Sequence, residues 1–166
     1  MEKVKLSLNP SKEKRLPSNL EAEQALIGSV LVNNDIIDEI STVINNQKFF
    51  DPFHRKIYET IENLNNKGMI ANPITLKNYF ENENSLSEVG GVDYLIKLTR
   101  FSSSAKQAVD YAKLIHEMYV KRELISISDN ISGDSQNDTL EKTGENIIEE
   151  AEQSLYQLAE RGNFSQ

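Results

Sequence analysis

A long helical pattern in the last third of the chain limits the possible folds more than any other feature of the sequence. From Ala105 to about Ile131 the chain contains neither glycine nor proline, the two residues that most strongly disfavour a helix interior. Apolar residues recur there at spacings of three and four, which places them on one side of an α-helix. They are Ala108, Tyr111, Ala112, Ile115, Met118, Tyr119 and Ile125. The pattern predicts one long amphipathic helix.

A second helical pattern follows, up to about Arg161. Its apolar residues are Leu140, Ile147, Ile148, Ala151, Leu155 and Leu158. The segment "SGDSQND" between the two patterns predicts a turn, and Asp138 with Glu141 predicts a capping box at the start of the second helix. Two long helices joined by a short polar loop form an antiparallel helical hairpin, which we place at residues 104–162.

The apolar stripes of this hairpin are wider than two helices can cover for each other. A leftover apolar face of this kind favours self-association or another protein partner, although the hairpin could instead fold back against the rest of the chain. The residues expected to mediate self-association are Tyr111, Ile115, Met118, Ile147, Leu155 and Leu158.

Residues 17–103 show shorter helical patterns with clear start and stop signals. Asp51 before Pro52 predicts a helix start and Gly68 its end. Asn72 with Pro73 predicts another start, and Gly90-Gly91 a break before the helix that contains Tyr94. No stretch alternates as a strand would, so the fold class is all-α: a small globular helical bundle, residues 17–103, followed by the hairpin.

The stretch "LPSNLEAEQALIGSVL" predicts the first of these helices. Ser18 and Glu21 form the expected capping box, and Glu23 also suits the positive end of the helix dipole, so neither acid needs a catalytic role. Gly28 costs about 1 kcal/mol relative to alanine in a helix interior. We expect close approach of another helix there, such as the one containing Ile57 and Ile61.

The charge is unevenly distributed along the chain. The net charge is -8, but residues 1–16 carry five bases and two acids (+3), which leaves -11 for the remainder. An acidic body repels phosphate backbones, so we expect a protein partner and no direct DNA binding. Residues 1–16 are read as a flexible basic tail. No apolar run reaches the length of a membrane span, and a cytoplasmic location is expected.

Catalytic patterns are weak in this sequence. Cysteine is absent and there are only two histidines, His54 and His116, so thiolate chemistry and most structural zinc sites are excluded. No GxxxxGK[ST] phosphate-binding loop is present, so the chain is not expected to be an enzyme. The acidic run containing Glu149, Glu150 and Glu152 lacks the Glu-x-x-His pairs of helical di-metal sites, and a solvated acidic face is the preferred interpretation. We expect no metal and no cofactor.

Five segments in series resemble one family. They are "LPSNLEAEQALIGSVL", "FFDPFHRKIYETI", "ITLKNYF", "VGGVDYLIKL" and "YAKLIHEMYVKRELI", and together they resemble the N-terminal domain of DnaB-type replicative DNA helicases over residues 16–160. The resemblance implies a helical head followed by a hairpin, with hairpins pairing between subunits and a trimer of dimers forming a collar over a hexameric ring. The ATPase domain, which would bind ATP and Mg²⁺, is absent from this sequence.

The resemblance also implies a role in docking. In the family the collar binds the C-terminal helicase-binding domain of primase, and the matching positions here are Tyr94, Ile125 and Ile131, with Arg122 and Leu124 flanking them. A helicase loader is a further candidate partner. The resulting hypothesis is an assembly and partner-docking domain of a helicase that unwinds DNA at the replication fork. The alternatives are a stand-alone helical adaptor and, less favoured, an acidic helical metalloenzyme.

Overall fold

The structure is a computed structural model that describes residues 15–80, 87–88 and 90–162. Within these ranges it contains helices and no strand, which confirms the all-α prediction. Residues 1–14 of the predicted basic tail lie outside the described residues. None of the described helices combines the length and apolar character that a bilayer crossing requires.

The head is built from short helices arranged around one apolar core. In chain order they are α1 (Leu20–Val32), α2 (Ile36–Ile40), the 3-10 turn η1 (Asn46–Lys48), α3 (Pro52–Asn66), α4 (Pro73–Phe80) and α6 (Val92–Thr99). The helix starts predicted at Asp51-Pro52 and Asn72-Pro73 are confirmed, because the Asp51 side chain accepts hydrogen bonds from the Phe53 and His54 amides and Asn72 accepts from the Ile74 and Thr75 amides.

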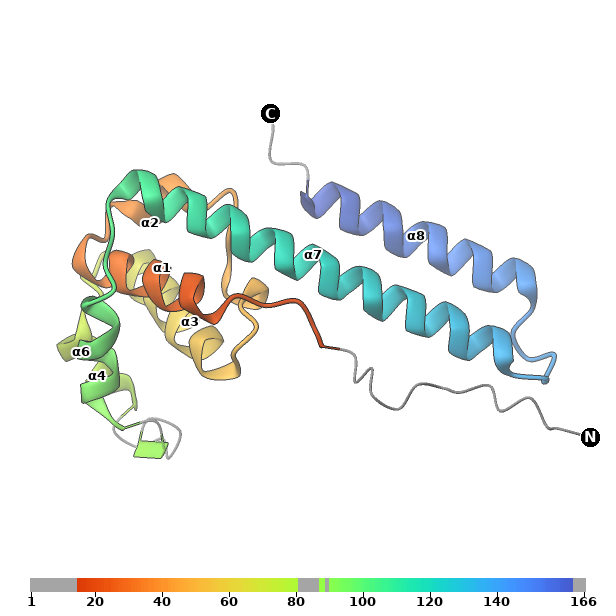
Figure 1. Ribbon diagram of the computed structural model, residues 1–166, viewed down its shortest axis with the longest axis horizontal. Coiled ribbons are helices and arrows are strands. Elements are labelled where there is room, and N and C mark those ends of the chain that lie inside the picture. The colour runs from red at the N-terminus through yellow and green to blue at the C-terminus, as the bar shows by residue number, and fades with distance from the viewer. Residues whose placement is uncertain (1–14, 81–86, 89, 163–166) are drawn as a thin grey trace, which may run out of the picture.

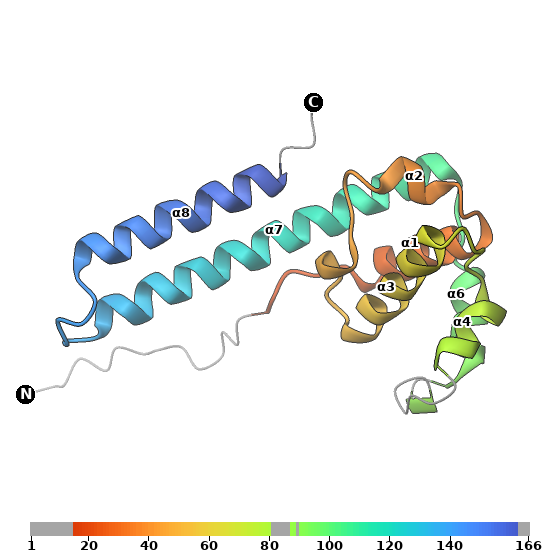
Figure 2. The ribbon, with the colours of Figure 1, turned by 180° about the vertical axis from the view of Figure 1, so that it is seen from behind.

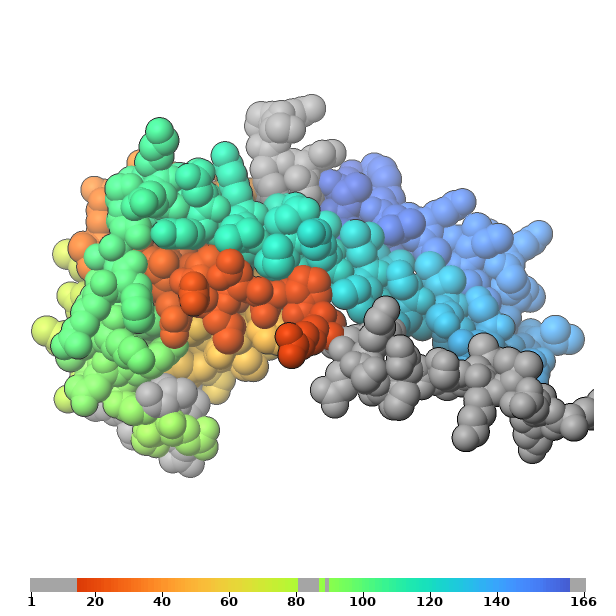
Figure 3. Space-filling model, in the orientation of Figure 1, coloured from red at the N-terminus to blue at the C-terminus, as the bar shows by residue number. Residues whose placement is uncertain are grey.

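The hairpin consists of α7 (Ala105–Gln136) and α8 (Gly144–Gly162). α7 runs from the head to the far tip of the molecule, and α8 returns along its distal half (Figures 1 and 2). The head and the hairpin nevertheless share a core, because Ala108, Ala112 and Ile115 of α7 are buried together with residues of α1, α2 and α3. The space-filling view shows α1 lying directly against the first half of α7 (Figure 3).

The predicted turn at residues 132–138 is wrong for most of its length. α7 continues through Ser132, Gly133 and Asp134 and ends at Gln136. The capping box predicted at Asp138 and Glu141 is also wrong. α8 begins at Gly144 instead, where the Asn146 amide donates to the Thr143 hydroxyl and Asn146 Oδ1 accepts from the Thr143 amide.

The capping box predicted at Ser18 and Glu21 is wrong by one residue. Asn19 is the N-cap of α1, and its side chain accepts from the Ala22 amide at 2.9 Å. The expected close approach at Gly28 exists, but the neighbour is the end of α6 and not α3. A Cβ at Gly28 would lie 1.9 Å from the carbonyl oxygen of Leu98, so α1 and α6 are in backbone contact there.

Candidate protein-docking and self-association surfaces

Tyr94 lies in the first turn of α6, where Gly91 precedes the helix with a φ of 68°. Its ring packs against Phe53, with the ring centres 5.8 Å apart, and lies nearly parallel to the His54 ring, at an interplanar angle of 9° and with the ring centres 6.1 Å apart. The hydroxyl lies 2.6 Å from His54 Nε2. Tyr94 is thus half-buried and joins α6 to α3.

His54 connects Tyr94 to a buried carboxylate on α1. His54 Nδ1 is 2.9 Å from Glu23 Oε1, and the two side chains are 2% and 1% exposed. Glu23 also accepts hydrogen bonds from the amides of Phe50 and Asp51, at 2.8 and 3.2 Å. From the sequence, Glu23 is expected only to favour the helix dipole. A cationic His54 just after a helix start opposes that dipole, and this is the one local signal that the sequence offers for the histidine.

The electrostatic surroundings of Tyr94 favour its protonated form. Burial raises the pKa of the Tyr94 hydroxyl, and the carboxylates of Asp51 and Glu23 raise this pKa further, while a hydrogen bond from Gln24 opposes the rise. The hydroxyl therefore keeps its proton at neutral pH and can serve as a hydrogen-bond donor inside the chain.

The other two predicted docking residues lie on the distal half of α7 and not beside Tyr94. Ile125 is half-buried and about 30 Å along the axis from the start of α7, and Ile131 is 36% exposed one to two turns further. The three predicted docking residues therefore do not form one compact patch within a single chain. Any common surface would need a partner that spans the junction of head and hairpin, or a second copy.

Arg122 holds the distal half of α7 to the head. Its guanidinium donates to the carbonyl oxygens of Pro17 and Lys48, at 2.7 and 2.8 Å. The same group lies over the ring of Phe50, 5.2 Å from its centre. The guanidinium joins two segments of the head to one helix turn, and this turn also carries Leu124 and Ile125.

An open apolar groove runs between α7 and the end of α8. It has a volume of about 430 Å³ and is lined by His116, Glu117, Val120, Leu124, Leu155, Leu158 and Ala159. Leu124 and Leu155 remain 41% and 44% exposed. Burial and nearby Lys48 lower the pKa of His116, so its ring is uncharged at neutral pH and the groove stays largely apolar.

The six residues predicted to mediate self-association occupy different environments. Leu155 lines this groove, and Leu158 forms its buried floor. Ile147 lines a smaller cleft, described below, and Met118 is half-buried. Tyr111 is half-buried beside Asn19 and Phe101 on the head. Ile115 is buried in the core of its own chain, so it supports α7 and offers no free surface.

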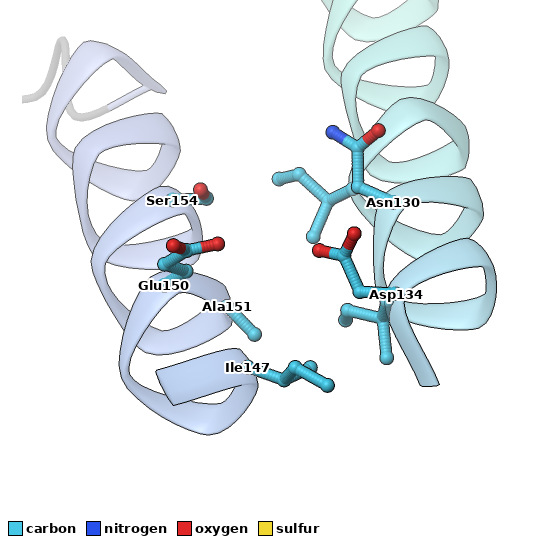
Figure 4. A pocket seen from close by; sticks show the side chains of 8 residues that line it. Asn130, Asp134, Ile147, Glu150, Ala151 and Ser154 are labelled. Carbon is cyan, nitrogen blue, oxygen red and sulfur yellow. The ribbon is translucent and has the colours of Figure 1, made fainter. Parts of the chain in front are cut away.

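A second, smaller cleft lies near the tip of the hairpin. Asn130 and Asp134 of α7 face Ile147, Glu150, Ala151 and Ser154 of α8 across it (Figure 4), and its volume is about 60 Å³. Ile131 also lines the cleft, so this predicted docking residue helps to hold the hairpin together. Lys142 bridges Asp134 and Glu150 at 2.7 and 2.6 Å. Within the described ranges no three metal-ligating side chains are grouped to hold an ion.

These elements define an all-helical domain composed of a globular head and an antiparallel hairpin. The sequence pattern of the family described as DnaB-like helicase N terminal domain matches residues 15–117. The chain belongs to this family.

Relatives and solved structures agree with that assignment. The replicative DNA helicase DnaB of Rickettsia bellii is 41% identical over 147 residues, which cover 89% of this chain and 30% of the relative. The replicative DNA helicase DnaC of Bacillus subtilis is 31% identical over 149 residues, 90% of this chain and 32% of that protein. The chain thus spans about a third or less of these relatives.

The N-terminal domain of DnaB helicase from Mycobacterium tuberculosis has the same fold. The TM-score is 0.78 at 23% identity, and the match covers 86% of this chain and 99% of that structure. A DnaB-like replicative helicase, solved in a study of its interactions with primase, matches with a TM-score of 0.67 and 26% identity. That match covers 84% of this chain and 31% of the helicase. These matches cover only the N-terminal part of the helicases and no motor domain.

Proposed function

We propose that this chain is the assembly and partner-docking domain of a replicative DNA helicase that unwinds DNA at the replication fork. The observation that carries the proposal is the family match, combined with a hairpin that leaves an apolar groove open to solvent. On this proposal ATP and Mg²⁺ act in a separate motor domain, and the chain itself contributes contacts and no chemistry. Its expected setting is the cytoplasm.

Pairing of hairpins is the first part of this function. The groove between α7 and α8 exposes Leu124 and Leu155, and burial of one such side chain contributes about 1.5–3 kcal/mol. Two copies would bury four of these side chains, enough to offset part of the entropy cost of association. In the parent helicase the same pairs would assemble into a hexameric collar.

Sedimentation of the purified chain from micromolar to hundreds of micromolar tests the pairing. We expect a monomer–dimer equilibrium, and we expect Leu155→Asp to weaken it by about tenfold or more because a charge replaces a buried leucine. Ile148→Asp is the control: Ile148 is also on α8 and is 59% exposed, against 44% for Leu155, but it does not line the groove. A strict monomer at all concentrations would contradict pairing, and a larger effect of the control would place the interface on another face.

Docking of primase is the second part. It is supported by the similarity to a DnaB-like helicase studied with primase and by the resemblance that matches Tyr94, Ile125 and Ile131 to docking positions of the family. Because these residues lie on the head and on distal α7, the proposed partner, the C-terminal helicase-binding domain of primase, would contact both parts. A helicase loader would be a second partner, and direct contact with DNA is not proposed.

Binding of that primase domain to charged variants of α7 tests the docking. Ile125→Asp should weaken binding at least tenfold, since it places a carboxylate in an apolar contact. Ser128→Asp adds the same charge at a nearby exposed position of α7 and should have little effect. Circular dichroism establishes that both variants keep their helicity. Equal affinities for the two variants would mean that the docking surface lies elsewhere. If the unsubstituted chain does not bind primase at all, an adaptor for other partners is favoured.

A further inference from the structure

The buried polar chain that ends at Tyr94 has a role that the family match does not describe. It links three helices: Glu23 on α1, His54 on α3 and Tyr94 on α6, with distances of 2.9 Å from Glu23 to His54 and 2.6 Å from His54 to Tyr94. Glu23 and His54 are almost fully buried, whereas Tyr94 is half-buried. The polar chain thus runs from the core of the head to its surface.

The hydrogen-bond partners define the direction of each bond. The Glu23 carboxylate already accepts from two backbone amides, of Phe50 and Asp51, and an ionised carboxylate can only accept. His54 Nδ1 therefore carries the proton that Glu23 accepts. In the neutral ring Nε2 is then the acceptor, so the Tyr94 hydroxyl donates to it. Glu23 selects the histidine tautomer, and that tautomer determines the direction of the Tyr94 hydroxyl.

We propose that Glu23 and His54 are positioning residues that hold Tyr94 in its binding orientation before a partner arrives. This inference rests on the proposed docking role of Tyr94. The tyrosine is held at two points, through its hydroxyl by His54 and Gln24 and through its ring by packing against Phe53. A side chain that is already ordered loses less entropy on binding, which raises affinity without any additional contact.

Stability alone gives a weak reason for a buried acid and a buried imidazole at this place. Apolar residues of similar volume often replace buried polar groups of this kind without loss of stability. Hydrogen bonds from two backbone amides that precede α3 account in part for the buried Glu23 carboxylate. They do not require a histidine whose second nitrogen points at a half-buried tyrosine. A role in orienting that tyrosine accounts for both nitrogens.

Two substitutions of His54 separate its hydrogen bond with Glu23 from its hydrogen bond with Tyr94. The amide group of asparagine takes about the place of Nδ1, and that of glutamine about the place of Nε2. His54→Asn therefore retains a group for Glu23 and loses the contact with Tyr94, whereas His54→Gln does the reverse. Tyr94→Phe removes the same contact from the other side, together with the hydrogen bond from Gln24, and keeps the ring.

The decisive measurement is the affinity of these variants for the C-terminal helicase-binding domain of primase. We expect His54→Asn and Tyr94→Phe each to weaken binding by about three- to tenfold. The double variant should be no weaker than Tyr94→Phe alone, because that substitution already removes the bond with His54, and His54→Gln should bind more tightly than His54→Asn. Effects that multiply in the double variant would mean that His54 acts only on stability, and would overturn the inference.

Proton NMR of the chain without primase provides a second test. A hydroxyl proton held by His54 exchanges slowly with water, so Tyr94 should give a low-field proton resonance that is lost in His54→Asn and Tyr94→Phe. Glu23→Gln should shift or broaden it. Glu21→Gln, the same charge change at an exposed residue of α1, should leave it unchanged. Absence of this resonance from the parent chain would overturn the inference.

Tyr94→Ala separates the inference from the docking function on which it rests. If Tyr94→Ala binds primase as tightly as the parent chain does, docking at Tyr94 is wrong and the positioning role falls with it. If Tyr94→Ala binds poorly while the His54 and Tyr94 effects multiply, docking stands and only the positioning role is wrong.

Discussion

At the scale of single residues, Gly28 is the position where the backbone of one helix touches that of another. A Cβ there would lie 1.9 Å from the Leu98 carbonyl oxygen and 2.8 Å from its carbon, and both are backbone atoms that cannot rotate away. The next residue strengthens the junction, because the Ser29 hydroxyl accepts from the Ser103 amide at 2.9 Å. The Gly28-Ser29 pair thus holds the end of α6 and the turn into α7.

Gly28→Ala should therefore destabilise the chain although alanine is the better helix former. We expect the free energy of unfolding to fall by about 2–4 kcal/mol, since α6 must shift to admit one methyl group. Gly133→Ala is the matched control. It also lies within a helix, a Cβ there meets nothing within 4 Å, and we expect a gain of about 0.5–1 kcal/mol. Urea denaturation measures both, and a gain for Gly28→Ala would contradict the close approach.

At the scale of elements, α7 is held to the head by Arg122 as well as by its apolar face. The guanidinium donates to two carbonyl oxygens that belong to different segments, Pro17 and Lys48. Its planar fork lets one group reach both while it lies over the ring of Phe50. A lysine has a single ammonium group and cannot reproduce this geometry.

Arg122→Lys should accordingly recover little of what Arg122→Ala loses. We expect each to lower the free energy of unfolding by about 2–3 kcal/mol, because two carbonyl groups lose a charged donor. Lys121→Ala, the exposed neighbour on the same helix, should change stability by less than about 0.5 kcal/mol. Chemical denaturation of the three variants gives the comparison. A lysine variant as stable as the parent chain would show that charge alone holds α7 in place.

The elements also show which parts of the fold a sequence can reveal. Helices and their proline starts were predictable because periodicity and caps are local signals, as at Asp51-Pro52. The turn expected at Ser132–Asp138 failed because helix-breaking composition was outweighed by packing of Ile131 against α8, together with the Lys142 bridge. The link from Glu23 to His54 joins residues 31 apart, and no local pattern signals it. The predicted docking and pairing residues remain predictions.

At the scale of the whole molecule, α7 is shared by two regions of unequal packing. Its first half contributes Ala108, Ala112 and Ile115 to the core of the head. On its distal half, from Leu124 onward, the described residues include no fully buried side chain, and α8 contributes only Leu158 to the buried set. Local unfolding starts where few apolar contacts are buried, so the tip of the hairpin should open before the head does.

Native-state hydrogen exchange at low protein concentration should resolve this gradient along one continuous helix. Amides near Ala112 and Ile115 should exchange only with global unfolding, whereas those between Leu124 and Gln136, and those of α8, should exchange through a partial opening. The expected difference is about 2 kcal/mol or more. If hairpins pair through the groove, a higher protein concentration should raise protection beside it, around Leu124 and Leu155, and not in the core of the head, because pairing buries the groove. Leu155→Asp should abolish that rise. Equal protection along all of α7 at low concentration would mean that head and hairpin unfold as one unit.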